Sequence, residues 1–261
     1  MPGIEIPFKE SGQGLPVVFL HGYPFDKSMW SDQLDVIAAA GFRAIAPDLR
    51  GLGETQSSSE VAAMDDMARD VAALLDQLDV QRAVVCGLSM GGYVAFDFAH
   101  LFPERVRGLV LAGTRAPADS DQEKAGREQQ VQTMLRAGMV PISIATLPKL
   151  LAPRTLAEKP DVVKRVRAMI TKSDPNGAAA AQRGMASRRD YTEGLARINV
   201  PTLIIVGRED SIRPVAAAEF MHRGIRDSRL EIIEDAAHMT NMEQPEAFNR
   251  VLIEFLNELS H

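Results

Sequence analysis

Short apolar runs bounded by Gly and Pro recur along the chain, and they predict buried strands. Six of them stand out, at residues 16–20, 43–47, 83–86, 106–112, 203–206 and 230–233. Between them, apolar side chains return at helical spacing, which predicts amphipathic helices. These helical segments are 31–40, 64–78, 91–100, 215–223 and 245–259. Strands that alternate with helices predict an α/β fold, with a mostly parallel sheet covered on both faces.

The alternation stops between the fourth and fifth of these strands. Residues 115–195 carry helical patterns without a convincing strand, polar at first and then apolar and interrupted by prolines. We expect this segment to form a helical cap over the ends of the strands. The chain then divides into a first core part (1–114), the cap (115–195) and a second core part (196–261).

Ligands of an open parallel sheet bind beyond the carboxyl ends of its strands, so the residues after each strand matter most. Residues 87–91 read Gly-Leu-Ser-Met-Gly, after a predicted strand and before a predicted helix. In this context G-x-S-x-G is typical of a sharp turn that exposes a nucleophilic serine. The helix N-terminus beneath the turn favours negative charge. Ser89 is therefore the candidate nucleophile.

Two later strand ends carry the groups that such a nucleophile needs. Asp210 follows the predicted strand at 203–206, and His238 follows the one at 230–233. A carboxylate can hold a histidine in one tautomer and stabilise its cation. We therefore expect Asp210 to orient His238, the base. The neighbouring Glu209 is a rival carboxylate that we expect to face solvent.

Acyl transfer also needs two N–H groups aimed at the developing oxyanion. The residue after the nucleophile, Met90, supplies one of them. The loop that begins His21-Gly22-Tyr23-Pro24 supplies the other, and we assign it to Tyr23. His21 itself is expected to order this loop by hydrogen bonding.

Four apolar residues are candidates for contact with substrate: Trp30, Met134, Leu147 and Met239. Apolar side chains of this kind line most small-molecule pockets. They are also the residues that pack a cap onto a core, and the sequence leaves both alternatives open.

Charge and composition narrow the partners. The net charge of −6 argues against a nucleic acid, whose phosphates require a basic face. The single cysteine, Cys86, excludes an intrachain disulfide and a zinc cluster of thiolates. No apolar run approaches the roughly 18 residues of a membrane span. The first residues contain neither a basic start nor a long apolar run, so we expect no signal peptide and a cytoplasmic location.

These motifs, together with PDLRGLGET at 47–55 and AAHMTNMEQPEAFN at 236–249, resemble the α/β-hydrolase family over nearly the whole chain. They look most like its small esterases, enol-lactone hydrolases and cofactor-free haloperoxidases or perhydrolases. The resemblance implies an α/β-hydrolase fold with an eight-stranded, mostly parallel sheet and no cofactor. It carries the family's nucleophile, acid and base, in that chain order, onto Ser89, Asp210 and His238. It also carries the oxyanion donors onto Tyr23 and Met90.

The predicted function is a serine hydrolase that cleaves carboxylic esters of small acyl substrates through an acyl-enzyme. A lactonase similar to 3-oxoadipate enol-lactonase stays open, and its anionic substrate would require a cation from the cap. The available cations are Arg136, Lys149, Arg154 and Arg183. A perhydrolase or haloperoxidase, with peroxide in place of water, is a further alternative. A ligand receptor without turnover is another alternative, and the fact that all three triad positions are filled argues against it. A small ester or lactone is the expected partner, and the oligomeric state stays open.

Overall fold

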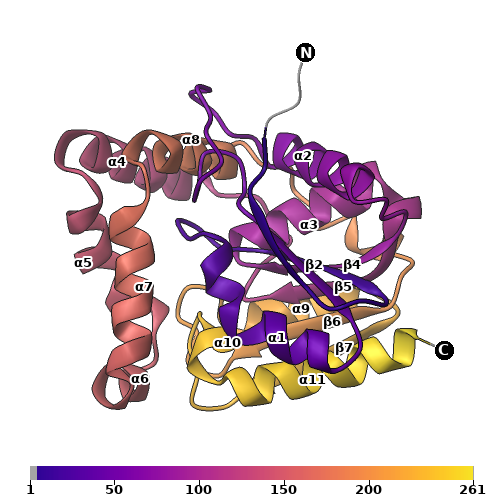
Figure 1. Cartoon of the computed structure of the whole chain (residues 1–261). Coiled ribbons are helices and arrows are strands. Elements are labelled where there is room, and N and C mark those ends of the chain that lie inside the picture. The colour runs from indigo at the N-terminus through magenta and orange to yellow at the C-terminus, as the bar shows by residue number, and fades with distance from the viewer. Residues whose placement is uncertain (1–4, 261) are drawn as a thin grey trace.

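One twisted sheet organises the fold (Figure 1). In the computed structural model, which describes residues 5–260, seven strands lie in the order β1-β3-β2-β4-β5-β6-β7. Strand β1 runs antiparallel to β3, and the other neighbours are parallel. The strands are β1 (Phe8–Ser11), β2 (Pro16–Leu20), β3 (Arg43–Pro47), β4 (Ala83–Leu88), β5 (Val106–Ala112), β6 (Thr202–Gly207) and β7 (Ser228–Ile233).

The six predicted strands and the mostly parallel sheet are confirmed. Strand β1 was not predicted, because its Phe-Lys-Glu-Ser sequence lies at the edge of the sheet, where side chains stay exposed and no apolar run is needed. We expected eight strands, and the sheet has seven within residues 5–260. Gly12 and Gly14, at φ 82° and 103°, turn the chain from β1 directly into β2, so β1 is the one antiparallel strand at this edge.

Helices cover both faces of the sheet. Helix α1 (Ser31–Ala39) packs against α11 (Pro245–Leu259) on one face, and α2 (Met64–Gln77) packs against α3 (Met90–Leu101) on the other (Figure 1). Helix α9 (Val215–Gly224) connects β6 to β7, and the short α10 (Thr240–Glu243) precedes α11. The five predicted helices are therefore present, with ends within one or two residues of the expected ones.

Five helices between β5 and β6 stand together beside the sheet, and we call them the helical insertion (Figure 1). They are α4 (Asp121–Ala137), α5 (Met139–Leu150), α6 (Pro153–Glu158), α7 (Pro160–Lys172) and α8 (Pro175–Ala186). Helix α4 packs on α8, and α5 packs on α7. The insertion meets the core closely, since a Cβ atom on Gly177 would lie 1.8 Å from the carbonyl oxygen of Gly51.

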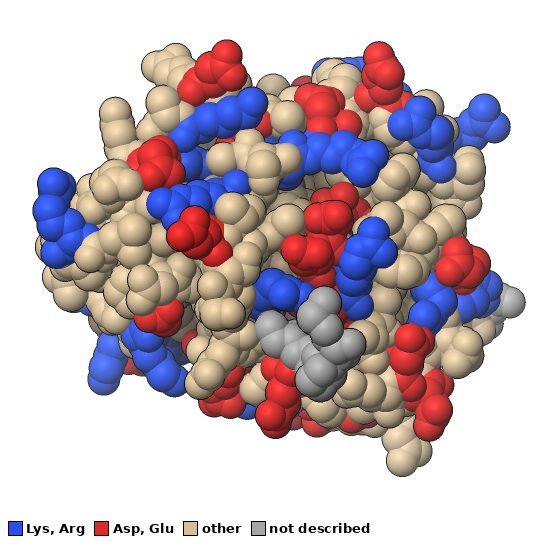
Figure 2. All heavy atoms as spheres, turned by 90° about the horizontal axis from the view of Figure 1, so that it is seen from above, with Lys and Arg blue, Asp and Glu red and all other residues tan. Residues whose placement is uncertain are grey.

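The described helices include none that is both long and apolar enough to cross a membrane. Figure 2 shows acidic and basic side chains interspersed over the face that it presents. That face carries charges of both signs, unlike the basic face that nucleic-acid binding requires.

Candidate active site

Ser89 occupies the turn between β4 and α3 in a strained conformation, with φ 55° and ψ −110°. Only small neighbours permit this turn, because a Cβ atom on Gly87 would lie 2.2 Å from the carbonyl oxygen of Gly91. Strand β5 holds the turn in place: the Ser89 N–H donates to the Ala112 carbonyl at 2.8 Å, and the Thr114 hydroxyl donates to the Ser89 carbonyl at 2.9 Å. The Ser89 side chain thus projects from a fixed backbone and stays partly exposed.

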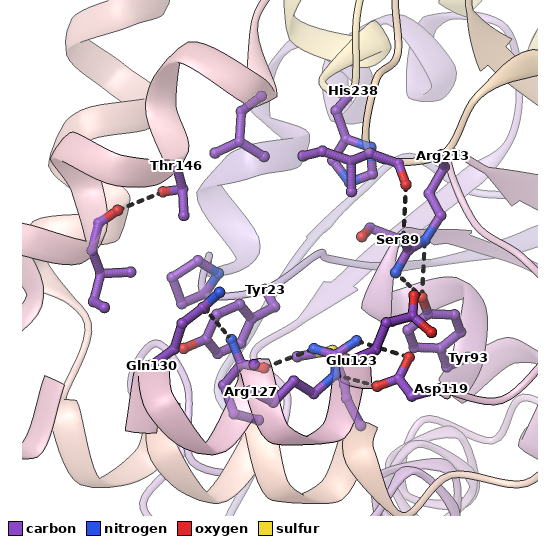
Figure 3. Close-up of a pocket in the computed structure, with 17 residues that line it drawn as sticks. Tyr23, Ser89, Tyr93, Asp119, Glu123, Arg127, Gln130, Thr146, Arg213 and His238 are labelled. Atoms are coloured by element: carbon purple, nitrogen blue, oxygen red, sulfur yellow. Dashed lines mark hydrogen bonds and ion pairs between the residues drawn. The ribbon is translucent and has the colours of Figure 1, made fainter. Parts of the chain in front are cut away.

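Asp210 and His238 form a buried pair at the ends of β6 and β7. Nδ1 of His238 lies 2.8 Å from Oδ2 of Asp210, and both side chains are almost wholly inaccessible to solvent. The other oxygen, Oδ1, accepts the N–H groups of Ile212 and Arg213 at 2.8 Å each. With Nδ1 donating to the carboxylate, Nε2 of His238 is the free acceptor. Ser89 and His238 line the same cavity (Figure 3).

The buried carboxylate of Glu243, which the sequence analysis did not single out, anchors the loop that carries His238. Its oxygens accept four hydrogen bonds: from the N–H groups of Ala237 at 2.9 Å, Met239 at 3.2 Å and Ala152 at 2.7 Å, and from the Thr155 hydroxyl at 2.8 Å. Ala237 and Met239 flank His238, whereas Ala152 and Thr155 belong to the helical insertion. Burial raises the pKa of Glu243 even against these four donors. This carboxylate therefore ties the histidine loop to the insertion.

The two predicted oxyanion donors lie beside the turn that carries Ser89, one at the start of a helix and one on a loop. Met90 is the first residue of α3, and the first N–H groups of a helix have no acceptor within it. Tyr23 follows β2 and lines the same cavity as Ser89 (Figure 3). Their backbone N–H groups are thus contributed by two different strand ends.

His21 lies just before Tyr23 and makes two hydrogen bonds with backbone groups. Its Nδ1 donates to the Gly22 carbonyl at 2.9 Å, and its Nε2 accepts the Leu49 N–H at 2.9 Å. Burial lowers the pKa of His21, which favours the neutral ring that this pairing requires. As expected from the sequence, His21 orders its loop.

A cavity of about 280 Å³ lies between the strand ends and the helical insertion. The core contributes Tyr23, Pro24, Ser89, Tyr93, Ile212, Arg213 and His238. The insertion, with the segment that leads into it, contributes Asp119, Glu123, Gly126, Arg127, Gln130, Ile142, Thr146, Leu150, Gln182 and Met185. Many of these residues carry polar groups, although most of the exposed wall is apolar, and they come from positions far apart in the sequence.

Two of the four apolar candidates for substrate contact belong to the core instead. Trp30 is fully buried, with its ring centroid 5.0 Å from that of Phe19 and 5.9 Å from that of Phe248. Met239 is also fully buried and does not line the cavity. Both residues therefore pack the core and do not contact the cavity, because the core helices cover them.

The other two candidates, Met134 and Leu147, pack inside the helical insertion. Met134 is fully buried, and its sulfur lies 3.7 Å from the Tyr23 hydroxyl, behind the cavity wall. Leu147 is buried on α5, whereas Thr146 and Leu150 on the same helix line the cavity. The rotation of each insertion helix about its own axis decides which of its residues face the cavity. The sequence pattern did not determine this rotation.

The predicted cap cations also lie away from the cavity. Arg136, Lys149 and Arg154 are exposed, and Arg183 pairs with Glu128. The guanidinium groups on the wall belong to Arg127 of α4 and to Arg213 of the β6–α9 loop. The expectation named cap residues only, and therefore missed Arg213, which the core supplies.

Asp119 forms the centre of an ionic cluster on this wall. Its buried carboxylate contacts the guanidinium groups of Arg115 and Arg188 at 2.6 Å each, and that of Arg127 as well. Burial raises the pKa of Asp119, but the hydrogen bonds and charges of Arg127 and Arg188 outweigh it and hold the pKa far below its usual range. Arg115 also pairs with Glu123 at 2.7 Å.

Tyr93 lies one helical turn after Ser89 and connects this cluster to Arg213. Nε and Nη2 of Arg213 donate to the Tyr93 hydroxyl at 3.1 and 2.6 Å (Figure 3). The Arg188 guanidinium lies over the Tyr93 ring, 4.1 Å from its centroid. Burial raises the pKa of Tyr93, but the charges of Arg213, Arg188 and Arg127 together hold it below its usual value.

Residues 5–260 contain no group of three or more His, Cys, Asp or Glu side chains placed to hold a metal ion. The side chains gathered at the cavity include a serine, a histidine paired with a carboxylate, and two arginines. A histidine oriented in this way beside a serine can act as its general base.

Known proteins resemble this chain over most of its length. The family model described as alpha/beta hydrolase fold matches residues 16–245. The chain is 31% identical to 3-oxoadipate enol-lactonase 2 of Acinetobacter baylyi, over 90% of this chain and 86% of that protein. It is 30% identical to the non-heme chloroperoxidase CPO-A1 of Kitasatospora aureofaciens, over 98% and 97%.

Among solved structures, a thermophilic esterase from Thermogutta terrifontis, determined with malate bound, is 41% identical. It superposes with a TM-score of 0.97 and covers 99% of this chain and 95% of that one. From the family match, these relatives and the seven-stranded sheet, we conclude that the chain belongs to the α/β-hydrolase family.

Proposed function

We propose that the protein is a serine hydrolase that cleaves carboxylic esters of small acyl compounds through an acyl-enzyme. The observation that carries the proposal is the buried His238–Asp210 pair on the same cavity as the strained, partly exposed Ser89. In α/β hydrolases, a nucleophile, an acid and a base in this chain order form the triad that catalyses acyl transfer. Relatives named as an esterase and an enol-lactonase support the same reaction class.

In the proposed mechanism, Nε2 of His238 takes the proton of Ser89 as its Oγ attacks the ester carbonyl. The N–H groups of Tyr23 and Met90 stabilise the oxyanion, and losing one such donor typically costs about 10²–10³ in rate. His238 then returns the proton to the departing alcohol. Water, activated by the same imidazole, attacks the acyl-enzyme and releases the acid. Asp210 stabilises the imidazolium through its hydrogen bond to Nδ1.

The helical insertion takes the part of a cap in this proposal. It provides Ile142, Thr146 and Leu150 to the cavity wall and so limits the size of the acyl group. A volume of about 280 Å³ lies at the lower end of small-molecule sites, which favours short substrates. The division of the chain at 115–195 and its cytoplasmic location stay predictions.

A lactonase is the second candidate, and the guanidinium groups of Arg127 and Arg213 on the cavity wall favour it. A lactone is an internal ester, so the same three residues would open it through the same intermediate. The relative named 3-oxoadipate enol-lactonase supports this alternative. Peracid formation, as in the haloperoxidase alternative, would use the same acyl-enzyme with peroxide in place of water.

Hydrolysis of p-nitrophenyl acetate, butyrate and octanoate by the wild type and by Ser89→Ala tests the proposal. We expect turnover that falls with acyl length and disappears in Ser89→Ala. Ser58→Ala, which changes an exposed serine, is the matched control and should behave as the wild type. If folded wild-type protein turned over none of the esters and did not open lactones either, the proposal would be wrong.

A further inference from the structure

The cavity wall carries one guanidinium group, that of Arg213, that no carboxylate of the described residues pairs with. Four guanidinium groups gather there or directly behind it, those of Arg115, Arg127, Arg188 and Arg213. The carboxylates of Asp119 and Glu123 pair with the first three of these groups, and within the described residues none pairs with Arg213. Partly buried cations are costly unless an anion compensates them. The unpaired guanidinium of Arg213 therefore suits an anion that the protein itself does not supply.

Of the two arginines that line the cavity, Arg213 has more unused donors than Arg127. Its two donations to the Tyr93 hydroxyl and one from Nη1 to the Ile212 carbonyl, at 2.7 Å, occupy three N–H groups. A guanidinium carries five, so two N–H groups are left for another acceptor. The described part of the chain pairs this guanidinium with no carboxylate. It is half-buried and lies on the cavity wall, where a ligand can reach it.

The Tyr93 hydroxyl supplies a further donor at the same place. Because its oxygen accepts two N–H groups from Arg213, its own hydrogen is left to donate elsewhere. The Arg188 guanidinium, stacked on the ring, and the nearby Arg127 make the phenol more acidic and its O–H a stronger donor. A phenol O–H beside a guanidinium suits the two oxygens of a carboxylate.

We propose that Arg213 and Tyr93, backed by Arg127, form a carboxylate-binding subsite, so that the substrate is a short ester or lactone that itself bears a carboxylate. The inference rests on the proposed function and specifies its substrate class. Tyr93 lies one turn of α3 beyond Ser89, so this carboxylate lies a few atoms from the carbonyl that is attacked. A half-ester of a short dicarboxylic acid places its two carboxyl groups in this way.

The test compares two esters of equal chain length, p-nitrophenyl hydrogen adipate and p-nitrophenyl hexanoate. They differ in a terminal carboxylate in place of a methyl group. The readout is the ratio of their kcat/KM values, with the Ser89→Ala rate subtracted to remove spontaneous hydrolysis. We expect the wild type to prefer the adipate ester. Arg213→Gln should lower this ratio about 10- to 100-fold, mainly through KM, because hydrogen bonds to a charged group are lost.

Three further variants sharpen the comparison. Arg213→Lys keeps the charge but not the planar pair of donors, and should recover part of the preference. Tyr93→Phe should lower the ratio less than Arg213→Gln does, because one neutral donor is lost. Arg223→Gln, which changes an exposed arginine of α9, is the matched control and should leave the ratio as in the wild type.

The preference should also depend on pH with a defined sign. The charged groups facing Tyr93 are Arg213, Arg188, Arg127 and Arg115, all of which stay protonated between pH 6 and pH 10 as guanidinium groups do. As pH rises through the lowered pKa of Tyr93, the phenol becomes anionic and repels the carboxylate. The adipate preference should therefore decline toward alkaline pH in the wild type and stay flat in Tyr93→Phe.

Failure of the subsite and failure of the proposed function look different. If hexanoate is hydrolysed with dependence on Ser89 but adipate is not preferred, or if Arg213→Gln keeps the wild-type ratio, the subsite proposal is overturned and the hydrolase stands. If neither ester is hydrolysed, calorimetric titration of adipate into Ser89→Ala protein tests the subsite without turnover. Binding that Arg213→Gln abolishes would support the subsite, and no binding would overturn it.

Discussion

The two walls of the cavity are built in different ways. On the core side, each candidate catalytic group follows a strand, and backbone groups fix two of the three: Ser89 donates its N–H to Ala112, and Asp210 accepts the N–H groups after it. On the side of the helical insertion, Arg127 and Asp119 are fixed by one another, through side chains from separate segments. The candidate chemistry thus follows the strand ends of the core, whereas the proposed subsite joins two core residues, Arg213 and Tyr93, to the ionic cluster of the insertion wall.

The largest effect should come from the core wall, with Asp210→Asn. The Asn carbonyl would still accept the N–H groups of Ile212 and Arg213, which turns its amide N–H₂ toward Nδ1 of His238 and imposes the wrong tautomer. We expect kcat to fall about 10⁴-fold with little change in melting temperature. Glu209→Gln, at the rival carboxylate one residue away, is the control and should stay active. Full activity in Asp210→Asn would contradict the assignment of the acid.

On the other wall, Asp119→Asn should affect stability more than chemistry. It removes the charge that balances three guanidinium groups, and breaking one partner of such a buried pairing typically costs about 3–5 kcal/mol. Urea unfolding measures the loss, with Asp121→Asn, at a fully exposed carboxylate, as the control. Equal unfolding free energies for the two variants would show that the arginines do not depend on Asp119.

The same cluster should give the wild type a defined acid sensitivity. Because the folded-state pKa of Asp119 is lowered, its contribution to stability is complete above the unfolded-state pKa and is lost as pH falls through the folded-state pKa. Below about pH 3.8, the wild type should therefore lose more stability than Asp119→Asn does. Unfolding free energies measured across this range should converge for the two proteins, and curves that stay parallel would contradict the pairing.

The contrast between the two walls also explains which features the sequence revealed. The strands, the core helices and the triad candidates follow from apolar runs and from the residues just after them, since backbone geometry there is local. The pocket-lining residues do not, because Leu147 and Thr146 are neighbours on one helix and only the packing of α5 on α7 decides which faces the site. Arg213 was missed for a related reason. The sequence analysis sought the cation in the cap, whereas a long side chain of the core extends into the cavity.

Glu243 connects the two walls, so its variant tests how far they are independent. In Glu243→Gln, the amide oxygen could still serve the N–H groups beside His238, but the amide N–H₂ would oppose the Ala152 N–H. Leaving such buried donors unsatisfied costs about 1–3 kcal/mol. We expect a lower unfolding free energy together with a lower kcat, whereas Glu246→Gln, at an exposed carboxylate, should change neither. A loss of stability without any change in kcat would mean that the Glu243 carboxylate does not position His238.

The smallest expected effect concerns the start of the insertion wall. Ser120 and Glu123 form a capping box at the N-terminus of α4, in which the Ser120 hydroxyl accepts the Glu123 N–H and the Glu123 carboxylate accepts the Ser120 N–H at 2.8 Å. Ser120→Ala should lower the unfolding free energy by about 1 kcal/mol, which a shift in the urea midpoint measures. The ion pair between Arg127 and Asp119 does not depend on this capping box, so the adipate preference should be kept in Ser120→Ala. Its loss would mean that helix α4, and not the ionic cluster, positions the wall.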